Sequence, residues 1–394
     1  MAKKPDRRSA WLRGGDRVAS LALTLGAFAA YASAFGSLGN AQEALALAFL
    51  CCLAGSFVST FVHELGHAVV ALACGWRVVT FVVRPIGVHL VNLDIAWIGG
   101  AHPGPELGWV LSVPRRRRVD TPARWAAVIG AGPGASLLLA AIAAVPWLLL
   151  LRPDAPYPSV AGRLCLGLAV QALNCGLRAL FGDEQGSDGR KLRTPRERGT
   201  PFSALAWIDS LLNANVRLRD LPPWLIETAR EATEEPERVA RHLAALEIGI
   251  VLDSFRVDAA RARSLIDAFR LQFGGDPWLD ACDAYLAAIW EGEAEPRHRP
   301  VVAPDMDPHL VRLGHAALAA VAVRRGDAVA ARRHLKAMKA AVRRASPFPN
   351  RTYRDIARQV RKAMREAKRA QRASQAATVP SSAGPPFRTK RLSQ

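Results

Sequence analysis

The chain has few cysteines, and no two of them stand in the C-x-x-C spacing of thiol metal sites or redox motifs. Only six occur in 394 residues, and most of them fall inside apolar runs. This usage argues against both a disulfide framework and a cysteine zinc site. We expect small buried hydrophobic residues at these positions, which are Cys51, Cys52, Cys74, Cys165, Cys175 and Cys282.

Acidic residues are also scarce beside basic ones. The 34 Asp and Glu residues face 53 Lys and Arg residues, which gives a formal net charge of +19. An excess of this kind can indicate nucleic-acid binding, but the sequence has no recognisable nucleic-acid motif, and its basic residues lie beside apolar runs and in a C-terminal helical tail. We expect anionic lipid at the cytoplasmic face of a membrane to be the partner of these charges, and no nucleic acid.

Long apolar segments are absent from Thr194 onward, so no membrane span is predicted there. The first half of the chain, in contrast, has four apolar runs of at least the roughly 20 residues that a spanning helix needs. This division predicts a mainly α protein: a polytopic membrane helical bundle with four spans, followed by a soluble α-helical domain. The predicted spans are Val18–Leu38, Ala44–Gly75, Trp125–Leu151 and Val160–Leu180.

The second predicted span is longer than the bilayer. At about 1.5 Å per residue, a helix from Ala44 to Gly75 would exceed the ~30 Å of hydrocarbon. We therefore expect this helix to tilt, to break near Gly55 or to project beyond the lipid at one end.

The distribution of Lys and Arg predicts the orientation of the spans. The segments before the first span, between the second and third, and after the fourth are rich in these residues, whereas 39–43 has none and 152–158 has only Arg152. Cytoplasmic loops carry the excess of positive charge. We therefore expect a multi-pass protein of the cell membrane with both termini in the cytoplasm.

Four parts are expected along the chain: a basic cytoplasmic N-terminus at 1–16, a membrane domain at 17–192, a cytoplasmic helical domain at 193–372 and a disordered tail at 373–394, which is rich in Ser, Pro and Ala. Helical periodicity dominates the third part. Its predicted helices are Trp224–Glu234, Arg238–Leu252, Ala259–Phe273, Trp278–Trp290, His309–Arg325, Ala328–Arg344 and about Tyr353–Arg372.

One helical pair in this domain, from Ala319 to Leu335, is similar to a tetratricopeptide hairpin, with small residues where two helices approach each other. A tetratricopeptide-like domain would bind a protein partner or control substrate access. A helical bundle that only stabilises the membrane part is an equal alternative.

Residues 77–124 interrupt the helical pattern. Val78–Val83 and Val88–Ile98 are rich in β-branched residues, and Pro85-Ile86-Gly87 separates them. This pattern predicts a β-hairpin or two short strands. Arg115–Arg118 follow, and a block of four arginines is expected outside the lipid.

Two histidines and a glutamate stand in the second apolar run. Between Ala44 and Gly75 the only ionisable side chains are His63, Glu64, His67 and the cysteines, and ionisable groups within a membrane-length helix are costly and usually functional. On a helix, the two histidines lie one turn apart on one face, so both imidazoles can reach one metal ion. Glu64 stands beside them, as in the H-E-x-x-H helix of zinc peptidases. A pair of core histidines with a capping glutamate is the alternative.

The site-2 protease family of intramembrane zinc metallopeptidases has a zinc-binding helix that resembles the stretch from Phe61 to Leu72, F-V-H-E-L-G-H-A-V-V-A-L. The stretch Gly132-Pro133-Gly134-Ala135-Ser136 is similar to the family's G-P-x-x-N element, with Ser136 where asparagine is common. The resemblance covers roughly residues 44–192. It implies one Zn²⁺ ion, a small sheet beside the active site whose exposed edge could pair with an extended substrate, and substrates that are single-span membrane proteins.

A zinc hydrolase needs three protein ligands and one open position. Asp188 is the predicted third ligand, because Ser187-Asp188-Gly189 resembles the family's second signature, an aspartate followed by glycine after a membrane helix that carries an asparagine. Asn174 is the asparagine of the fourth span and a supporting residue, although the family's Leu-Pro does not follow it. We expect Gly189 to let the backbone turn back toward the metal. Asp183 is the competing ligand.

Two further histidines, His89 and His102, lie between the second and third spans. We expect both to be surface residues at the membrane interface rather than metal ligands.

Together these residues predict a zinc-dependent intramembrane endopeptidase that cuts near the cytoplasmic face. His63, His67 and Asp188 would hold the metal, and Glu64 would take a proton as water attacks the substrate carbonyl. Two other classes stay open. One is a pseudoprotease that uses its helical domain as a scaffold for membrane proteins, and the presence of Glu64 argues against it. The other is a metal-dependent transporter or sensor, for which more polar residues in several spans would be expected.

Overall fold

The computed structural model describes residues 7–36, 40–91, 93–98, 107–150, 160–181, 187–193, 198–214, 216–231, 236–253, 257–303, 306, 308–345 and 351–378. His102, Asp183 and residues 379–394 of the predicted tail therefore lie outside the described residues. The chain divides into two compact units, one of residues 1–243 and 346–349 and one of residues 244–345 and 350–394. Each unit is described by itself.

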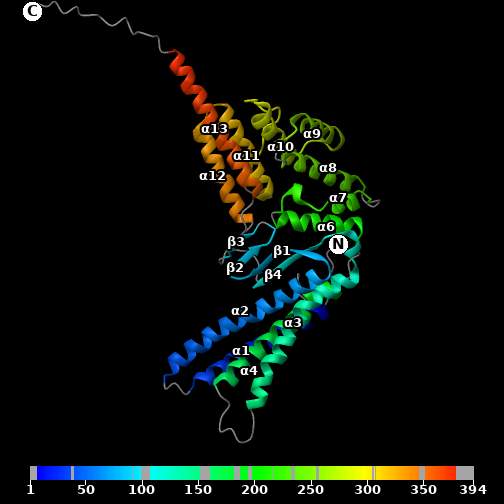
Figure 1. The fold of residues 1–394 in the computed structure, drawn as a ribbon, viewed down its shortest axis with the longest axis vertical. Helices are drawn as coiled ribbons and strands as arrows, with labels where there is room; N and C mark the ends of the chain where they lie inside the picture. The colour runs from blue at the N-terminus through cyan, green and yellow to red at the C-terminus, as the bar shows by residue number, and fades with distance from the viewer. Residues whose placement is uncertain are drawn as a thin grey trace, which may run out of the picture. The chain divides into compact units, whose positions relative to one another are not determined.

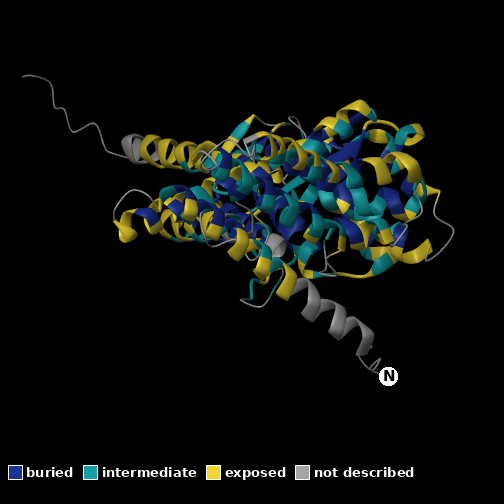
Figure 2. Ribbon diagram, turned by 90° about the horizontal axis from the view of Figure 1, so that it is seen from below, coloured by how far each residue is buried: buried dark blue, intermediate teal, exposed yellow. Residues whose placement is uncertain are grey.

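Four helices of the first unit are long and apolar enough to cross a membrane, as the sequence predicts. In Figure 1 they run side by side, with α3 against α4, α2 against α3 and α1 against α4. Many of their apolar side chains are exposed, such as Leu138 and Ile142 on α3, as a lipid-facing surface requires. Figure 2 shows that exposed and buried residues are mixed along the helices of the molecule. The four helices are α1 Arg7–Phe35, α2 Ala41–Ala73, α3 Pro122–Leu150 and α4 Val160–Phe181.

The second span, α2, continues through Gly55 without a break. Of the three alternatives for this long helix, the break near Gly55 is therefore wrong, and the glycine serves close packing instead. A Cβ at Gly55 would lie 2.5 Å from the hydroxyl oxygen of Tyr31 and would collide with Gln171. The Tyr31 hydroxyl donates a hydrogen bond to Gln171 Oε1 at 3.0 Å, and Gln171 Nε2 donates to the Cys52 carbonyl at 2.9 Å. This buried polar group ties α1, α2 and α4 together inside the bundle.

A four-stranded antiparallel sheet follows α2, with the strand order β3-β2-β1-β4. The predicted hairpin is therefore incomplete. The run from Val88 to Ile98 splits into two strands at a turn in which Leu93 has a φ of 53°. The strand β4 pairs with β1 from far along the chain, with Val83 opposite Gly108 and Trp76 opposite Pro114. The strands are β1 Trp76–Val83, β2 Ile86–His89, β3 Asp94–Trp97 and β4 Gly108–Pro114.

The sheet packs against the C-terminal half of α2. Ala68 and Ala71 of α2 form a buried cluster with Trp76 and Val78 of β1 and with Trp125 of α3. On its other side the sheet meets α6, and Figure 1 shows the sheet between α2 and α6. The rings of Trp76 and Trp207 pack edge-on, with centroids 5.5 Å apart. The strands are thereby fixed beside the part of α2 that carries the two histidines.

Short helices complete the first unit. They are η1 Arg117–Val119, α5 Asp188–Arg193, α6 Pro201–Asn213, η2 Leu218–Asp220 and α7 Pro223–Arg230. Asp120 fastens α6 to the membrane part, because its Oδ2 accepts hydrogen bonds from Gly199 N, Ser203 Oγ and Trp207 Nε1. The predicted helical domain at 193–372 includes α6 and α7, whereas these helices belong to the first compact unit.

The second unit is helical, and all the helices that the sequence predicts from residue 238 onward are present within a few residues of the predicted bounds. The helices α11 and α12 form a hairpin around a turn in which Gly326 has a φ of 75°. Small buried residues such as Ala316, Ala320 and Ala331 allow their close approach. A tetratricopeptide-like domain remains a prediction. The elements are α8 Pro236–Leu252, which begins in the first unit, α9 Ala259–Phe273, α10 Pro277–Leu286, the π-helix η3 Ala287–Glu291, α11 Pro308–Arg324, α12 Ala328–Ala345 and α13 Arg351–Thr378.

Candidate metal centre

The two histidines of α2 lie on one face of the helix, as their spacing predicts. His63 and His67 are both buried. Their Nε2 atoms are 3.3 Å apart and point to the same place. The helix therefore presents two imidazole nitrogens to one position next to α3.

The opposite ring nitrogen of each histidine is held by α3. His67 Nδ1 donates a hydrogen bond to the Val128 carbonyl at 2.7 Å, and His63 Nδ1 lies 3.0 Å from Ser136 Oγ. Since a carbonyl only accepts, His67 Nδ1 carries a proton, so in the neutral ring that binds a metal the lone pair is on Nε2. Hydrogen bonds of this kind fix the orientation of metal-binding imidazoles.

Asp188, at the start of α5, completes the group. Its Oδ2 lies 3.1 Å from the Nε2 atoms of both His63 and His67, and the carboxylate is buried with them. Its Oδ1 lies 3.5 Å from Lys191 Nζ. Burial alone would raise the pKa of Asp188, but the hydrogen bonds with His63 and His67 outweigh it and hold the pKa well below its ordinary value. The carboxyl is therefore in the ionised form that ligation requires.

The position of Asp188 depends on a close contact between α5 and α4. A Cβ at Gly189 would collide with the Leu180 carbonyl at the end of α4. From the sequence, this glycine is expected to let the backbone turn back toward the metal. Gly189 is not among the residues with positive φ, however, so the requirement is the absence of a side chain.

The donor atoms fit a tetrahedral zinc ion. Zinc binds imidazole nitrogen and carboxylate oxygen at about 2.0–2.2 Å, so neighbouring donors in a tetrahedron lie about 3.3–3.5 Å apart. The three observed separations are 3.1, 3.1 and 3.3 Å. Space for the ion comes from Gly132 of α3, where a Cβ would lie 2.7 Å from His63 Nε2 and closer still to His67 Nε2.

Glu64 stands next to this group without belonging to it. Its side chain is buried beside the first residue of β4, and a Cβ at Gly108 would lie 2.9 Å from Glu64 Oε1 and 2.7 Å from Thr60 Cγ2. The end of the sheet therefore passes directly over the glutamate. A carboxylate in this place can act on a water molecule beside the metal, because it is not itself a ligand.

Two other predicted residues lie elsewhere. The described hydrogen bonds of Asn174 do not involve the three ligands. Its amide donates to the Ser20 carbonyl at 3.4 Å and to Thr24 Oγ1 at 3.2 Å, both on α1. His89 is fully buried, and its Nε2 donates to the Ala214 carbonyl at 2.8 Å. The expectation that His89 is a surface residue is wrong, because the ring joins β2 to the end of α6.

Four groups contribute to the centre in ways that the sequence does not predict. Ser136 and the Val128 carbonyl orient the imidazoles, and Gly132 and Gly108 leave room for the metal and for Glu64. The glycine-rich element of α3 was a signal for Gly132. Gly108 carries no sequence signal, because its importance arises from the pairing of β4 with β1.

Comparison with known proteins gives one family match. The peptidase family M50 matches residues 49–371, which include α2 from Phe49 onward, the sheet, α3, α4 and Asp188. No curated protein and no solved structure matches the chain. The family consists of zinc metallopeptidases of the membrane, and the donor set and the four apolar helices described above agree with it. The chain therefore belongs to peptidase family M50, the site-2 protease family, which makes it an intramembrane metalloprotease.

Proposed function

We propose that the protein is a zinc-dependent endopeptidase that cleaves single-span membrane proteins close to the cytoplasmic surface of the membrane. The observation that carries this proposal is the convergence of His63 Nε2, His67 Nε2 and Asp188 Oδ2 within hydrogen-bond distance of one another, with Glu64 beside them. A zinc ion held by these atoms would supply a Lewis acid that polarises the substrate carbonyl and activates water.

The residues of the chain divide the remaining work. Glu64 accepts the proton of the attacking water and returns it to the leaving amine. Ser136 and the Val128 carbonyl keep the two imidazoles oriented throughout, because they hold the nitrogens that face away from the metal. Burial of the centre between α2, α3 and α5 limits access of bulk water.

The sheet gives the substrate a route to Glu64. In the described sheet β4 is an edge strand, and its first residue, Gly108, lies against the glutamate. An extended peptide that adds to the edge of β4 would run past Glu64 with its carbonyl groups accessible, which a helical peptide would not allow. The cleavable segment of a membrane helix would have to unwind before it binds.

The orientation of the protein follows from the basic residues. Asp188 lies just beyond the end of α4, and the sheet with Arg115–Arg118 just beyond the end of α2. We propose that this side faces the cytoplasm with both termini, since cytoplasmic segments carry the excess of Lys and Arg. Anionic lipid at that face, and a protein partner of the helical unit, are further proposals.

The experiment that tests the activity compares membrane proteins and their fragments in cells that carry the native chain or Glu64→Gln. This substitution keeps the three ligands and removes the base. A single-span protein that stays intact only with Glu64→Gln, and whose soluble fragment appears only with the native chain, is the expected result. Equal fragment patterns, with normal zinc content in both proteins, would favour the pseudoprotease that acts as a scaffold.

A further inference from the structure

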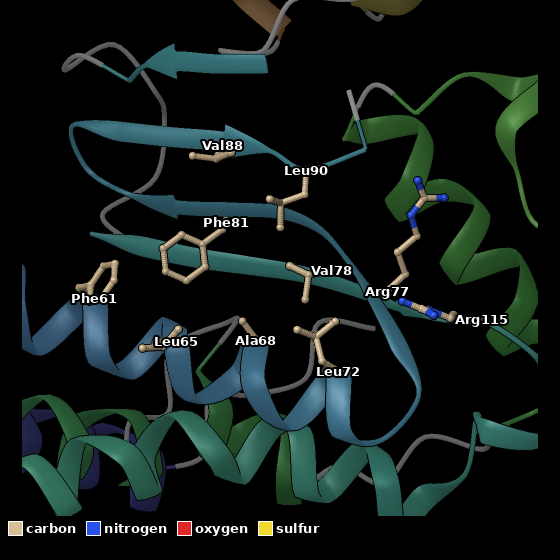
Figure 3. A pocket seen from close by; sticks show the side chains of 10 residues that line it. All are labelled: Phe61, Leu65, Ala68, Leu72, Arg77, Val78, Phe81, Val88, Leu90 and Arg115. Carbon is tan, nitrogen blue, oxygen red and sulfur yellow. The ribbon is translucent and has the colours of Figure 1, made fainter. Parts of the chain in front are cut away.

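A groove of about 390 Å³ lies between α2 and the sheet, on a different face of α2 from His63 and His67. Figure 3 shows one wall, formed by side chains of α2 that point toward the strands, and the opposite wall, formed by side chains of β1, of β2 and of Leu90, which directly follows β2. The α2 wall consists of Phe61, Leu65, Ala68 and Leu72, and the strand wall consists of Val78, Phe81, Val88 and Leu90.

Both walls are apolar and remain accessible. Phe61, Leu65, Leu72 and Leu90 are 40% to 53% exposed. At one end of the groove the rings of Phe61 and Phe81 pack edge-on, with centroids 5.7 Å apart. An accessible groove of this composition favours a hydrocarbon occupant.

The other end of the groove carries two positive charges. Arg77 is opposite Val113 in the β1–β4 pair, and Arg115 directly follows Pro114, so the two arginines come from neighbouring strands. Figure 3 shows both on the side of the groove where Leu72 lies, with the Arg77 side chain extending away from α2. Within the described residues, neither guanidinium has an ion-pair or hydrogen-bond partner. An anionic group between them would supply the missing counter-charge.

The length of the groove matches one leaflet of a bilayer. From Phe61 to Leu72 the helix rises by about 16 Å, and half of the ~30 Å hydrocarbon core is about 15 Å. Arg77 lies just beyond the last residue of α2, Ala73, where the chain leaves the apolar span. A lipid that enters the groove would therefore have its headgroup beside the arginines and an acyl chain beside the apolar walls.

The size of the groove distinguishes between two hydrocarbon occupants. A transmembrane helix is about 10 Å across with its side chains, and over ~16 Å it would fill more than roughly 1,000 Å³. The groove is much smaller than this. A single extended acyl chain is thin enough to enter it, and a substrate helix is not.

We propose that this groove binds one anionic phospholipid, with an acyl chain along α2 and the phosphate on Arg77 and Arg115. The lipid fills the space between the helix that carries the metal ligands and the strand β1 that supports β4. Bound there, it holds the sheet in place over Glu64. This inference goes beyond the proposed function, because binding of the lipid requires no cleavage.

The test is native mass spectrometry of the full chain in detergent, titrated with phosphatidylglycerol or with phosphatidylcholine of the same acyl chains. The Glu64→Gln chain is used as the parent, so that an added peptide is not cut. Arg77→Gln/Arg115→Gln removes the charges of the groove. Arg116→Gln/Arg118→Gln is the matched control, because these arginines are also exposed, change the net charge equally and are not part of the groove.

We expect one phosphatidylglycerol to bind tightly to the parent and to the control. The Arg77/Arg115 variant should bind it about thirtyfold more weakly, which corresponds to about 2 kcal/mol for two basic residues at an anionic surface. Phosphatidylcholine should bind weakly to all three. Leu90→Trp, which fills the groove without changing the charge, should also weaken phosphatidylglycerol binding.

Three results would overturn the proposal. Equal losses in the Arg77/Arg115 and Arg116/Arg118 variants would show a general effect of surface charge. Equal binding of the two lipids would show that the two arginines do not recognise the net negative charge of the lipid. Displacement of the lipid by a synthetic single-span peptide at equimolar concentration would identify the groove as a substrate path. None of these results depends on whether the native chain cleaves proteins.

Discussion

The hydroxyl oxygen of Ser136 lies 3.0 Å from Nδ1 of His63, in a place where neither residue is exposed to solvent. This contact links α3 to the first metal ligand of α2. The sequence shows serine here where the family commonly has asparagine, and the structure shows that serine still reaches the imidazole. The shorter side chain is sufficient because α2 and α3 approach closely, with Gly66 of α2 facing the Ala131 carbonyl.

Ser136→Ala should weaken zinc binding about 10- to 100-fold, the usual cost of losing a hydrogen bond that orients a metal-binding histidine. The measurement is a competition titration of zinc against a chelator. Ser59→Ala is the matched control, since Ser59 is also buried on α2 and its Oγ has no partner among the described residues. A normal zinc affinity in Ser136→Ala would show that packing alone orients His63.

Asp188→Asn should lose zinc, whereas Asp183→Asn should keep it. The amide in place of the carboxylate removes the only negative charge among the three donors and presents a weaker oxygen ligand. Metal content of the purified variants, measured by elemental analysis, decides between the two aspartates. Zinc retained in Asp188→Asn and lost in Asp183→Asn would reverse the assignment of the third ligand.

Gly132→Ala should abolish zinc binding and leave the protein folded. The new methyl group would lie 2.7 Å from His63 Nε2, in the space where the ion must sit. Overpacking of this kind costs typically about 1–3 kcal/mol of stability, so the variant should fold with a lowered Tm. Gly130→Ala, in the same glycine-rich element, has nothing within 4 Å of the new Cβ and serves as the control. The readouts are zinc content and thermal unfolding, and a Gly132→Ala protein with full zinc content would contradict the proposed position of the ion.

The sequence was sufficient to predict the features of the fold and of the metal centre that follow from local periodicity. The four spans, the helices from residue 238 onward, and the pairing of His63 with His67 on one face all depend on residues a few positions apart. The closeness of Asp188 could be predicted only through the resemblance to a family, because more than a hundred residues separate it from His63 in the chain.

The features that sequence reasoning missed arise from contacts between distant segments. The strand β4 was not predicted, since it is a strand only by pairing with β1. His89 was expected at the surface because histidine is polar, yet a single carbonyl acceptor, that of Ala214, allows it to be fully buried. Asn174 matches a family position, and its amide instead bonds with α1, a helix whose contacts the motif does not encode.

Gly108→Val should reduce the rate of cleavage without loss of zinc. A Cβ at this position lies 2.9 Å from Glu64 Oε1, so the larger side chain must displace the carboxylate, the end of β4 or both. A misplacement of about 1 Å at a catalytic group costs on the order of 10²-fold in rate. The metal ligands are on other elements or other faces of α2, so zinc content should stay at the level of the native chain. Cleavage of a single-span substrate in detergent, measured together with zinc content, separates this effect from a general defect. An unchanged rate would mean that β4 does not control the position of Glu64, and loss of zinc would mean that the sheet supports the metal centre itself.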